Sequence, residues 1–244
     1  MIVYNSYLKV FYSTLINDKN YFSGFATKEA GDARLLENIF GFFTCNKIAF
    51  QKIVVAQQIH SANIKEIDFK NKGDFEKVED TDGLLTKEKN IVLTIRTADC
   101  LPLIYVEKNQ GIIAISHNGW RGTIKKISYK IIEKITKLGG HTSFIKVAIG
   151  PGIGQCCYSI DEDRYYQFKD EFDGYSNKIF RWYKGKWHLN LILLNYLLLL
   201  DYGIKKENID YFPFCTSCDR RRFFSFRKDK KNDYGEMLSF IERI

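Results

Sequence analysis

The chain has 244 residues, of which 45% are hydrophobic, so it is long enough to bury a sizeable core. This length fits one α/β or α+β domain over residues 1–244 better than two small domains. The 37 Lys and Arg residues exceed the 29 Asp and Glu residues and give a formal net charge of +8, which alone selects no anionic partner. The one basic grouping is more typical of a solvated face and contains Arg220, Arg221, Arg222, Lys228, Lys230 and Lys231.

Nothing in the first residues of the chain predicts export or a membrane partner. Residues 1–12 mix apolar and polar side chains without an apolar stretch and a cleavage site. The longest apolar run, Leu189 to Leu200, is too short to cross a bilayer and is better read as a buried helix. Six cysteines in such a chain indicate reduced thiols in the cytoplasm rather than a disulfide framework.

Polar residues follow two predicted strands at the points where these strands end. The stretch from Lys52 to Ile59 has the pattern of a strand and ends at His60. A second strand, from Ile91 to Arg96, ends just before Thr97-Ala98-Asp99-Cys100. Each strand therefore delivers a candidate ligand at its terminus.

The next two apolar runs, residues 101–107 and 111–117, are separated by Lys108-Asn109-Gln110 and predict a hairpin. In antiparallel pairing about this turn, residues near 101 and 102 lie opposite His117. Directly opposed Cβ atoms are roughly 5 Å apart and diagonal ones about 7–8 Å. Cys100 and His117 are therefore expected close together, at the same end of neighbouring strands.

The rest of the chain alternates strands and helices without a strict βαβ rhythm or an internal repeat. This pattern favours an α/β fold with mixed sheets, or a layered α/β/β/α arrangement, over a doubly wound fold. The expected elements are a helix over 124–138 closed by Gly139 and Gly140, a strand over 144–149, a hairpin over 178–191 that turns at 184–186, and a helix over 190–202 that stops at Gly203.

Two imidazoles and one thiolate form a ligand set that zinc accepts. His60, Cys100 and His117 would leave the fourth position to water or substrate, as catalytic zinc sites do. The same Cys100 and His117 also suit a cysteine hydrolase with a thiolate nucleophile and its base, so both alternatives stand on the residues alone. The remaining histidines, His141 and His188, are expected in a loop and on a strand face.

Ordered motifs run from about residue 50 to the C-terminus. They are Gln57 to His60, Asp82 to Thr86, Thr97 to Ile104, His117 to Gly122, Ala148 to Ile153 with Cys156, Cys157 and Tyr158, and Cys215-Thr216 with Phe223 to Arg227. Together they resemble the motifs of the YfiH-like laccase-domain family. The resemblance implies a four-layer α/β/β/α fold and a zinc ion held by His60, Cys100 and His117. It further implies a purine nucleoside phosphorylase that acts on adenosine, inosine and methylthioadenosine, with adenosine deamination as a further activity and a link to peptidoglycan editing in related bacterial proteins.

The sequence departs from the family pattern in three places. Asn118 replaces the usual alanine after the second histidine, and Gly235-Glu236-Met237 replaces the usual Gly-Arg-Gln. A Gly/Ser-rich loop is shortened around residues 25–32. The metal ligands are retained, whereas substrate selection by the loop and the tail is left open.

Phosphorolysis requires groups that bind phosphate. Guanidinium groups hold phosphate through paired hydrogen bonds, so Arg96, Arg121 and Arg227, which lie in or beside the motifs, are the candidates. Asp99 is a candidate for proton transfer or for orienting a ligand. The plain alternatives are that Arg121 caps a helix and that Asp99 anchors a turn.

Multicopper oxidase chemistry needs more histidine ligands than this chain offers. Four histidines, two of them at the proposed zinc site, cannot supply a His₂Cys site and further His-rich sites. Copper binds most nitrogen and sulfur sites more tightly than zinc, so copper can displace zinc here in vitro.

Two other features stay open. Cys215 and Cys218 form a CxxC pair that resembles a redox or metal-binding motif, but a second CxxC is absent. The basic segment from Arg220 to Lys231 would suit a nucleic-acid-binding module, although no recognition motif accompanies it. We therefore expect small-molecule substrates and no nucleic-acid partner, and leave the oligomeric state open.

Overall fold

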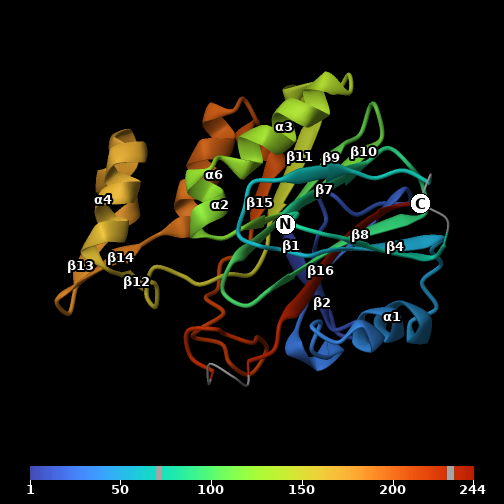
Figure 1. The fold of residues 1–244 in the computed structure, drawn as a ribbon, viewed down its shortest axis with the longest axis horizontal. Coiled ribbons are helices and arrows are strands. Elements are labelled where there is room, and N and C mark those ends of the chain that lie inside the picture. Colours follow the sequence, from blue (N-terminus) through green and yellow to red (C-terminus); the bar gives the residue numbers. More distant parts are fainter. Residues whose placement is uncertain (70–72, 230–233) are drawn as a thin grey trace.

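Two large sheets lie face to face in the computed structural model, and helices cover both outer faces (Figure 1). This arrangement confirms the layered α/β/β/α fold with mixed sheets. The structure describes residues 1–69, 73–229 and 234–244, so Lys230 and Lys231 of the basic segment lie outside the described residues.

The first sheet has seven strands in the order β1-β2-β3-β16-β8-β4-β6. Strand β4 runs parallel to both of its neighbours, β8 and β6, whereas the other pairs are antiparallel. The strands are β1 (Ile2–Asn5), β2 (Val10–Ser13), β3 (Tyr21–Ala26), β4 (Lys52–Ala56), β6 (Phe75–Val78), β8 (Ile91–Thr97) and β16 (Met237–Arg243).

The second sheet has six strands in the order β15-β11-β9-β10-β7-β5, with the β9-β10 hairpin at its centre. Its two outer pairs, β11 with β15 and β5 with β7, are parallel. The strands are β5 (Ile64–Glu66), β7 (Gly83–Thr86), β9 (Leu101–Glu107), β10 (Ile112–Asn118), β11 (Ile145–Ile149) and β15 (Ile209–Tyr211).

Alternation along the buried strands produces the layers. In β9, Ile104 and Val106 belong to the apolar core between the two sheets, whereas Leu103 and Tyr105 belong to the core under the helices. Helix α1 covers the outer face of the first sheet, and α2, α3 and α6 lie over the second (Figure 1). These helices are α1 (Leu36–Cys45), α2 (Trp120–Ile124), α3 (Ile127–Lys137) and α6 (Leu191–Asp201).

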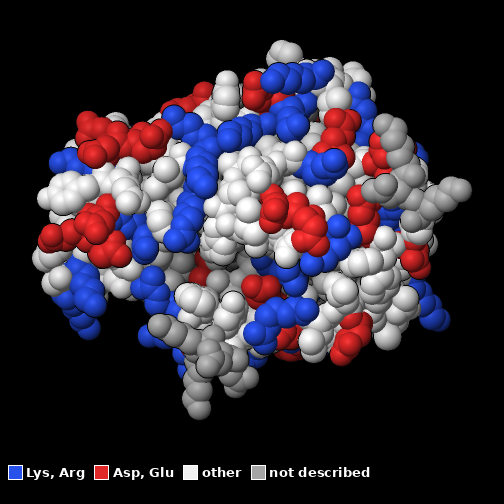
Figure 2. Space-filling model, viewed as in Figure 1, with Lys and Arg blue, Asp and Glu red and all other residues white. Residues whose placement is uncertain are grey.

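A small three-stranded sheet with α4 extends from one end of the sandwich (Figure 1). Figure 2 shows a band of basic side chains that crosses this face near α2, with acidic and basic groups mixed elsewhere. Within the described ranges, no helix has the length and apolarity needed to cross a membrane. The remaining elements are β12 (Ser159–Ile160), β13 (Phe180–Tyr183), β14 (Lys186–Leu189), α4 (Glu162–Glu171), α5 (Ser176–Ile179) and the 3₁₀ turns η1 (Lys28–Ala30), η2 (Thr142–Phe144), η3 (Asp173–Tyr175) and η4 (Lys206–Asn208).

The predicted central hairpin is confirmed, with His117 opposite Pro102 and Asn118 opposite Leu101. The strand expected to reach residue 59 instead ends at Ala56. Beyond that point the side chain of Gln58 replaces backbone pairing, because its amide nitrogen donates to the Arg96 carbonyl oxygen (2.7 Å) and its amide oxygen accepts from the Arg96 nitrogen (2.9 Å).

The helix expected over 124–138 is divided into α2 and α3. Lys126 separates them because its backbone is left-handed, with φ of 56°, so one continuous helix was the wrong prediction. The strand near 145–149, the hairpin over 180–189 and the helix over 191–201 are confirmed. The hairpin turns where Lys184 and Gly185 both have positive φ, as tight two-residue turns require.

Glu242 on β16 is a buried acid that gives the fold a pH dependence. Its side chain is 1% exposed, and one carboxylate oxygen has no hydrogen-bond partner among the described residues. Burial raises the pKa of Glu242 to about 7 from its ordinary 4.5. Stability that is present below pH 4.5 is therefore lost as the pH rises toward 7, at a cost of about 3 kcal/mol.

Glu242→Gln is expected to raise the free energy of unfolding above pH 7 and to change it little near pH 4.5. Urea unfolding at both pH values measures the difference. Glu37→Gln, on the exposed side of α1, is the control. Equal effects of Glu242→Gln at the two pH values would contradict the buried, ionising carboxyl group.

Candidate metal centre

The three predicted ligands meet where the chain passes between the two sheets. His60 lies between β4 of the first sheet and β5 of the second, and Cys100 lies between β8 and β9 in the same way. Strands β4 and β8 are parallel neighbours, so both crossovers start from the same edge. His117 lies near the end of β10, next to the start of β9. The topology thus brings the three predicted ligands together at one edge of the sandwich.

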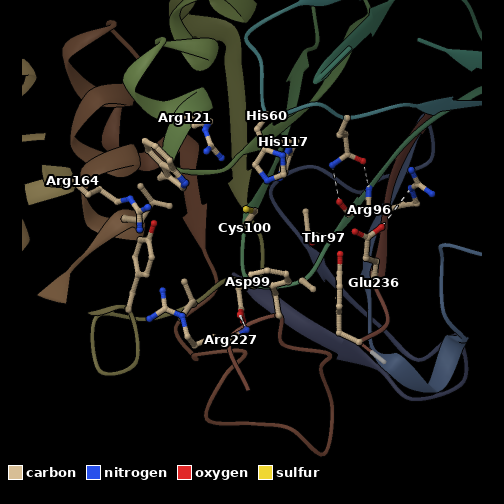
Figure 3. A pocket seen from close by; sticks show the side chains of 18 residues that line it. His60, Arg96, Thr97, Asp99, Cys100, His117, Arg121, Arg164, Arg227 and Glu236 are labelled. Atoms are coloured by element: carbon tan, nitrogen blue, oxygen red, sulfur yellow. Dashed lines mark hydrogen bonds and ion pairs between the residues drawn. The ribbon is translucent and has the colours of Figure 1, made fainter. Parts of the chain in front are cut away.

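The ligand atoms of His60, Cys100 and His117 all lie within 4.8 Å of one another. The two imidazole rings are 4.7 Å apart between centroids and nearly perpendicular (Figure 3). His60 has a left-handed backbone, with φ of 59°, and Asp99 before Cys100 has φ of 80°. Such conformations cost free energy in residues other than glycine and are concentrated at functional sites.

The carboxylate of Asp82 orients two of the three ligands, a role that the sequence does not predict. Its buried carboxylate lies 2.7 Å from Nδ1 of His117 and accepts hydrogen bonds from the backbone nitrogens of Ile59 (3.2 Å), His60 (3.1 Å) and Ser61 (2.7 Å). Because Nδ1 of His117 is engaged, Nε2 is left for a metal. The motif from Asp82 to Thr86 carried the only sequence signal for this residue.

The space between the ligands depends on Gly119. A Cβ atom at this position would lie 2.9 Å from Sγ of Cys100 and 3.3 Å from Cδ2 of His60. No side chain therefore fits beside the ligand atoms without displacing them. The donor set, its spacing and this glycine fit a zinc ion with three protein ligands and one open position.

The electrostatics of the ligand set favour a cation. Burial opposes ionisation of Cys100, but the neighbouring His117 and His60 lower its pKa to about 7. Burial likewise opposes charge on His117, whereas the Cys100 thiolate and Asp82 raise its pKa to about 10. Hydrogen bonds from His117 and Ser61 outweigh burial and lower the pKa of Asp82 to about 2. The anionic Asp82 and a readily ionised thiol therefore surround the position of the cation.

A pocket of about 410 Å³ opens in front of the ligands, and four arginines line it (Figure 3). Arg121 and Arg164 lie over the ring of Trp120, with centroid distances of 4.3 and 4.4 Å. Arg164, on α4, was not predicted, because its sequence neighbourhood carries no motif. The other two are the predicted Arg96 and Arg227.

Arg96 and Arg227 are already engaged by neighbouring groups. Nε of Arg96 lies 3.7 Å from the carboxylate of Glu236. Nη1 of Arg227 donates to the carbonyl oxygen and the hydroxyl of Ser159, both at 3.0 Å. Nη2 of Arg164 likewise lies 3.7 Å from the carboxylate of Asp161. Arg121, which has no ion pair within the described ranges, is therefore the strongest of the four candidates for holding an anion in the pocket.

Asp99 anchors the opposite wall of the pocket. Its carboxylate accepts hydrogen bonds from the Thr216 hydroxyl (2.6 Å), the Ser225 hydroxyl (2.9 Å) and the backbone nitrogen of Arg227 (2.7 Å). Burial raises the pKa of Asp99, although these hydrogen bonds oppose the rise. The contacts favour the anchoring interpretation over proton transfer.

The Asn118 side chain extends away from the ligands into a buried polar network. Its amide nitrogen donates to the Ser128 hydroxyl (2.7 Å) and to the Asn195 side chain (2.9 Å), and its amide oxygen accepts from Ser116 (2.6 Å). This departure from the family pattern therefore ties β10 to α3 and α6 and leaves the ligand geometry intact.

His141 and His188 lie apart from the three ligands. Nδ1 of His141 lies 2.7 Å from the Ser143 hydroxyl, and Nδ1 of His188 lies 2.8 Å from the carbonyl oxygen of Gln155. They match the predicted loop and strand positions and serve as controls.

The fold and the site define an α/β sandwich with a candidate His₂Cys metal centre at one edge. A family model described as multi-copper polyphenol oxidoreductase laccase matches residues 18–244, and the chain belongs to this YfiH-like family. Relatives include purine nucleoside phosphorylase YlmD of Bacillus subtilis, 29% identical over 92% of this chain and 89% of the relative. YlmD of Geobacillus stearothermophilus is 34% identical over 79% and 73%. An adenosine deaminase named RL5, from an unknown prokaryotic organism, is 31% identical over 72% and 70%.

Solved structures share the fold. The crystal structure of YlmD from Geobacillus stearothermophilus matches with a TM-score of 0.85 and 27% identity over 96% of each chain. That of the hypothetical protein YfiH from Bacillus licheniformis matches with a TM-score of 0.84 and 28% identity, over 92% of this chain and 93% of the other.

Replacing any one of the three predicted ligands is expected to abolish zinc binding at this site, because three protein ligands leave no redundancy. Cys100→Ser, His60→Ala and His117→Ala should each lower the zinc content by one equivalent per chain. His141→Ala and His188→Ala should retain it. Elemental analysis of the purified variants measures the content, and full zinc in Cys100→Ser would contradict the ligand set.

Asp82→Asn is expected to weaken metal binding about 10- to 100-fold, since the amide keeps the size of the carboxylate but loses the charge that orients His117. A competitive chelator titration measures the affinity. Asp80→Asn, in the exposed turn before it, is the matched control. Equal affinities of the Asp82→Asn variant and the parent would mean that the orientation of His117 does not depend on this contact.

Proposed function

We propose that the chain, as one catalytic domain over residues 1–244, is a zinc-dependent purine nucleoside phosphorylase acting on adenosine, inosine and methylthioadenosine. The observation that carries the proposal is the pocket in which the His60, Cys100 and His117 set faces the guanidinium groups of Arg121 and Arg164. A phosphorylase must bind phosphate beside a glycosidic carbon, and this pocket pairs a candidate cation site with cationic side chains.

Each element of the pocket has a role in this proposal. Arg121 and Arg164 bind phosphate through their guanidinium edges while Trp120 supports their faces. The apolar side chains of Ile153 and Phe226, with Tyr158, supply a surface for a purine ring. Zinc, when bound, supplies a Lewis acid that orients phosphate or sugar oxygens or lowers the pKa of a bound water.

The names of the relatives support the proposed activity on purine nucleosides. Those of YlmD name purine nucleoside phosphorolysis, and that of RL5 names adenosine deamination. The laccase description of the family requires several histidine-rich copper sites. Of the four histidines, His141 and His188 lie outside the group formed by His60, Cys100 and His117. The chain therefore lacks the further histidine ligands that multicopper oxygen chemistry needs.

The cysteine hydrolase is the second candidate. Cys100 and His117 lie within reach of each other, and the pKa of Cys100 near 7 suits a nucleophile. A thiolate bound to zinc is not free to attack, so metal content separates the two functions. Alkylation of Cys100 without loss of metal would favour the hydrolase. We also propose a reducing compartment such as the cytoplasm, in which the six cysteines remain without disulfides.

The test is a panel of nucleosides incubated with and without phosphate, followed by identification of the products. Phosphorolysis is expected to yield free base and ribose 1-phosphate only when phosphate is present. Inosine and ammonia from adenosine would establish deamination instead. The proposal would be overturned if zinc-loaded protein yielded neither of these two sets of products.

Arg121→Ala is expected to raise KM for phosphate about tenfold or more while zinc is retained, because it removes charge-assisted hydrogen bonds worth about 1.5–3 kcal/mol. Arg164→Ala should act in the same direction. Steady-state kinetics against phosphate measure the change, with Arg181→Ala on the small sheet as the control. A lower melting temperature with unchanged phosphate dependence would make Arg121 a structural residue.

A further inference from the structure

A second group of thiols lies outside the metal centre. Cys215 and Cys218, the CxxC pair of the sequence, face Cys156 and Cys157 from the segment after β11. The four sulfur atoms all lie within 4.8 Å of one another. Sγ of Cys218 is 3.5 Å from that of Cys156 and 3.4 Å from that of Cys157. The sequence has no second CxxC motif, but the adjacent residues Cys156 and Cys157 supply the second pair of cysteines.

This spacing is that of a metal-binding tetrahedron. Four thiolates around zinc, with bonds of about 2.3 Å, place their sulfur atoms about 3.8 Å apart. A disulfide needs about 2.05 Å between two sulfurs and leaves the other two unexplained. Four sulfur atoms within 4.8 Å of one another therefore fit one shared cation better than disulfide pairing among themselves.

The surrounding backbone supports the same interpretation. The nitrogen of Gly154 donates to Sγ of Cys215 at 3.1 Å, and the nitrogens of Cys218 and Asp219 both approach the Cys215 carbonyl oxygen, which forms a tight turn. A Cβ on Gly154 would lie 3.0 Å from Cβ of Cys215 and 3.4 Å from Sγ of Cys156. Hydrogen bonds to sulfur and a closely packed glycine are features of thiolate metal sites.

We propose that Cys156, Cys157, Cys215 and Cys218 bind one structural Zn²⁺ ion as a tetrathiolate. Four protein ligands close the coordination sphere, in contrast to the open site at Cys100. The ion replaces four thiol protons. It joins two segments that are about 60 residues apart in the sequence.

The four cysteines of the proposed second site lie next to a wall of the pocket. Thr216, between the two late cysteines, donates to Asp99, which directly precedes the ligand Cys100. Tyr158, directly after the early cysteines, lines the pocket. Zinc at the four thiols would therefore fix the wall near Arg227 against the crossover that carries Cys100, without contacting a substrate.

The test counts zinc in protein purified under reducing conditions without chelator. The parent is expected to hold two equivalents per chain, and Cys215→Ser and Cys156→Ser one each. Cys45→Ser, an exposed cysteine elsewhere, should keep two. Cobalt substitution gives a second readout on the parent, since four thiolates yield a much stronger sulfur-to-cobalt charge-transfer band than one.

The outcomes separate this site from the catalytic one. Cys100→Ser should lose the zinc equivalent at the His60, Cys100 and His117 site and keep the strong cobalt band of the four thiolates. The absence of zinc at one site can therefore be recognised independently of the other site. Should the cysteine variants misfold, zinc in the parent should still protect these four thiols, but not Cys45, from alkylation. Unchanged zinc in Cys215→Ser, alkylation of all four thiols in zinc-loaded parent, or iron or a disulfide at these thiols in place of zinc would overturn the assignment.

Discussion

The buried carboxylate of Asp82 is the interaction on which the metal centre depends. It binds the backbone of the segment that carries His60 and the imidazole of His117, so it sets the positions of two ligands at once. An uncompensated carboxylate in this place would be costly, and the backbone donors, the Ser61 hydroxyl and His117 offset the burial. The crossover that carries His60 and the strand that carries His117 are therefore coupled through one anion rather than through the metal alone.

The arrangement of the two sheets brings the segments that Asp82 couples to one place. Strands β4 and β8 leave the first sheet side by side. The crossover from β8 enters the second sheet at β9 of the central hairpin, and the crossover from β4 enters it at the edge strand β5. Asp99 extends the arrangement to the far wall by holding Ser225 and Arg227. The residue that precedes the ligand Cys100 is thus hydrogen-bonded to the far wall of the pocket.

The sequence predicts the parts of this site that depend on local pattern. Two apolar runs and a short turn define the hairpin, and its register brings Cys100 to His117 because pairing in a hairpin is set by the turn. Asp82 and Arg164 reach the site through tertiary packing, which periodicity does not encode. The break at Lys126 was missed for a related reason, since the apolar positions of α3 continue those of α2.

The stack around Trp120 makes the pocket observable by light. The guanidinium carbons of Arg121 and Arg164 lie 4.3 and 4.4 Å from the centroid of the Trp120 ring, so the emission of this indole is expected to respond to the charge of both groups. An anion bound at the edges of these guanidinium groups would offset part of their charge. The other two tryptophans, Trp182 and Trp187, belong to the small sheet, 5.1 Å apart between centroids, and form a separate background. The protein therefore carries its own fluorescent reporter of anion occupancy, which a Trp120→Phe variant would isolate by difference.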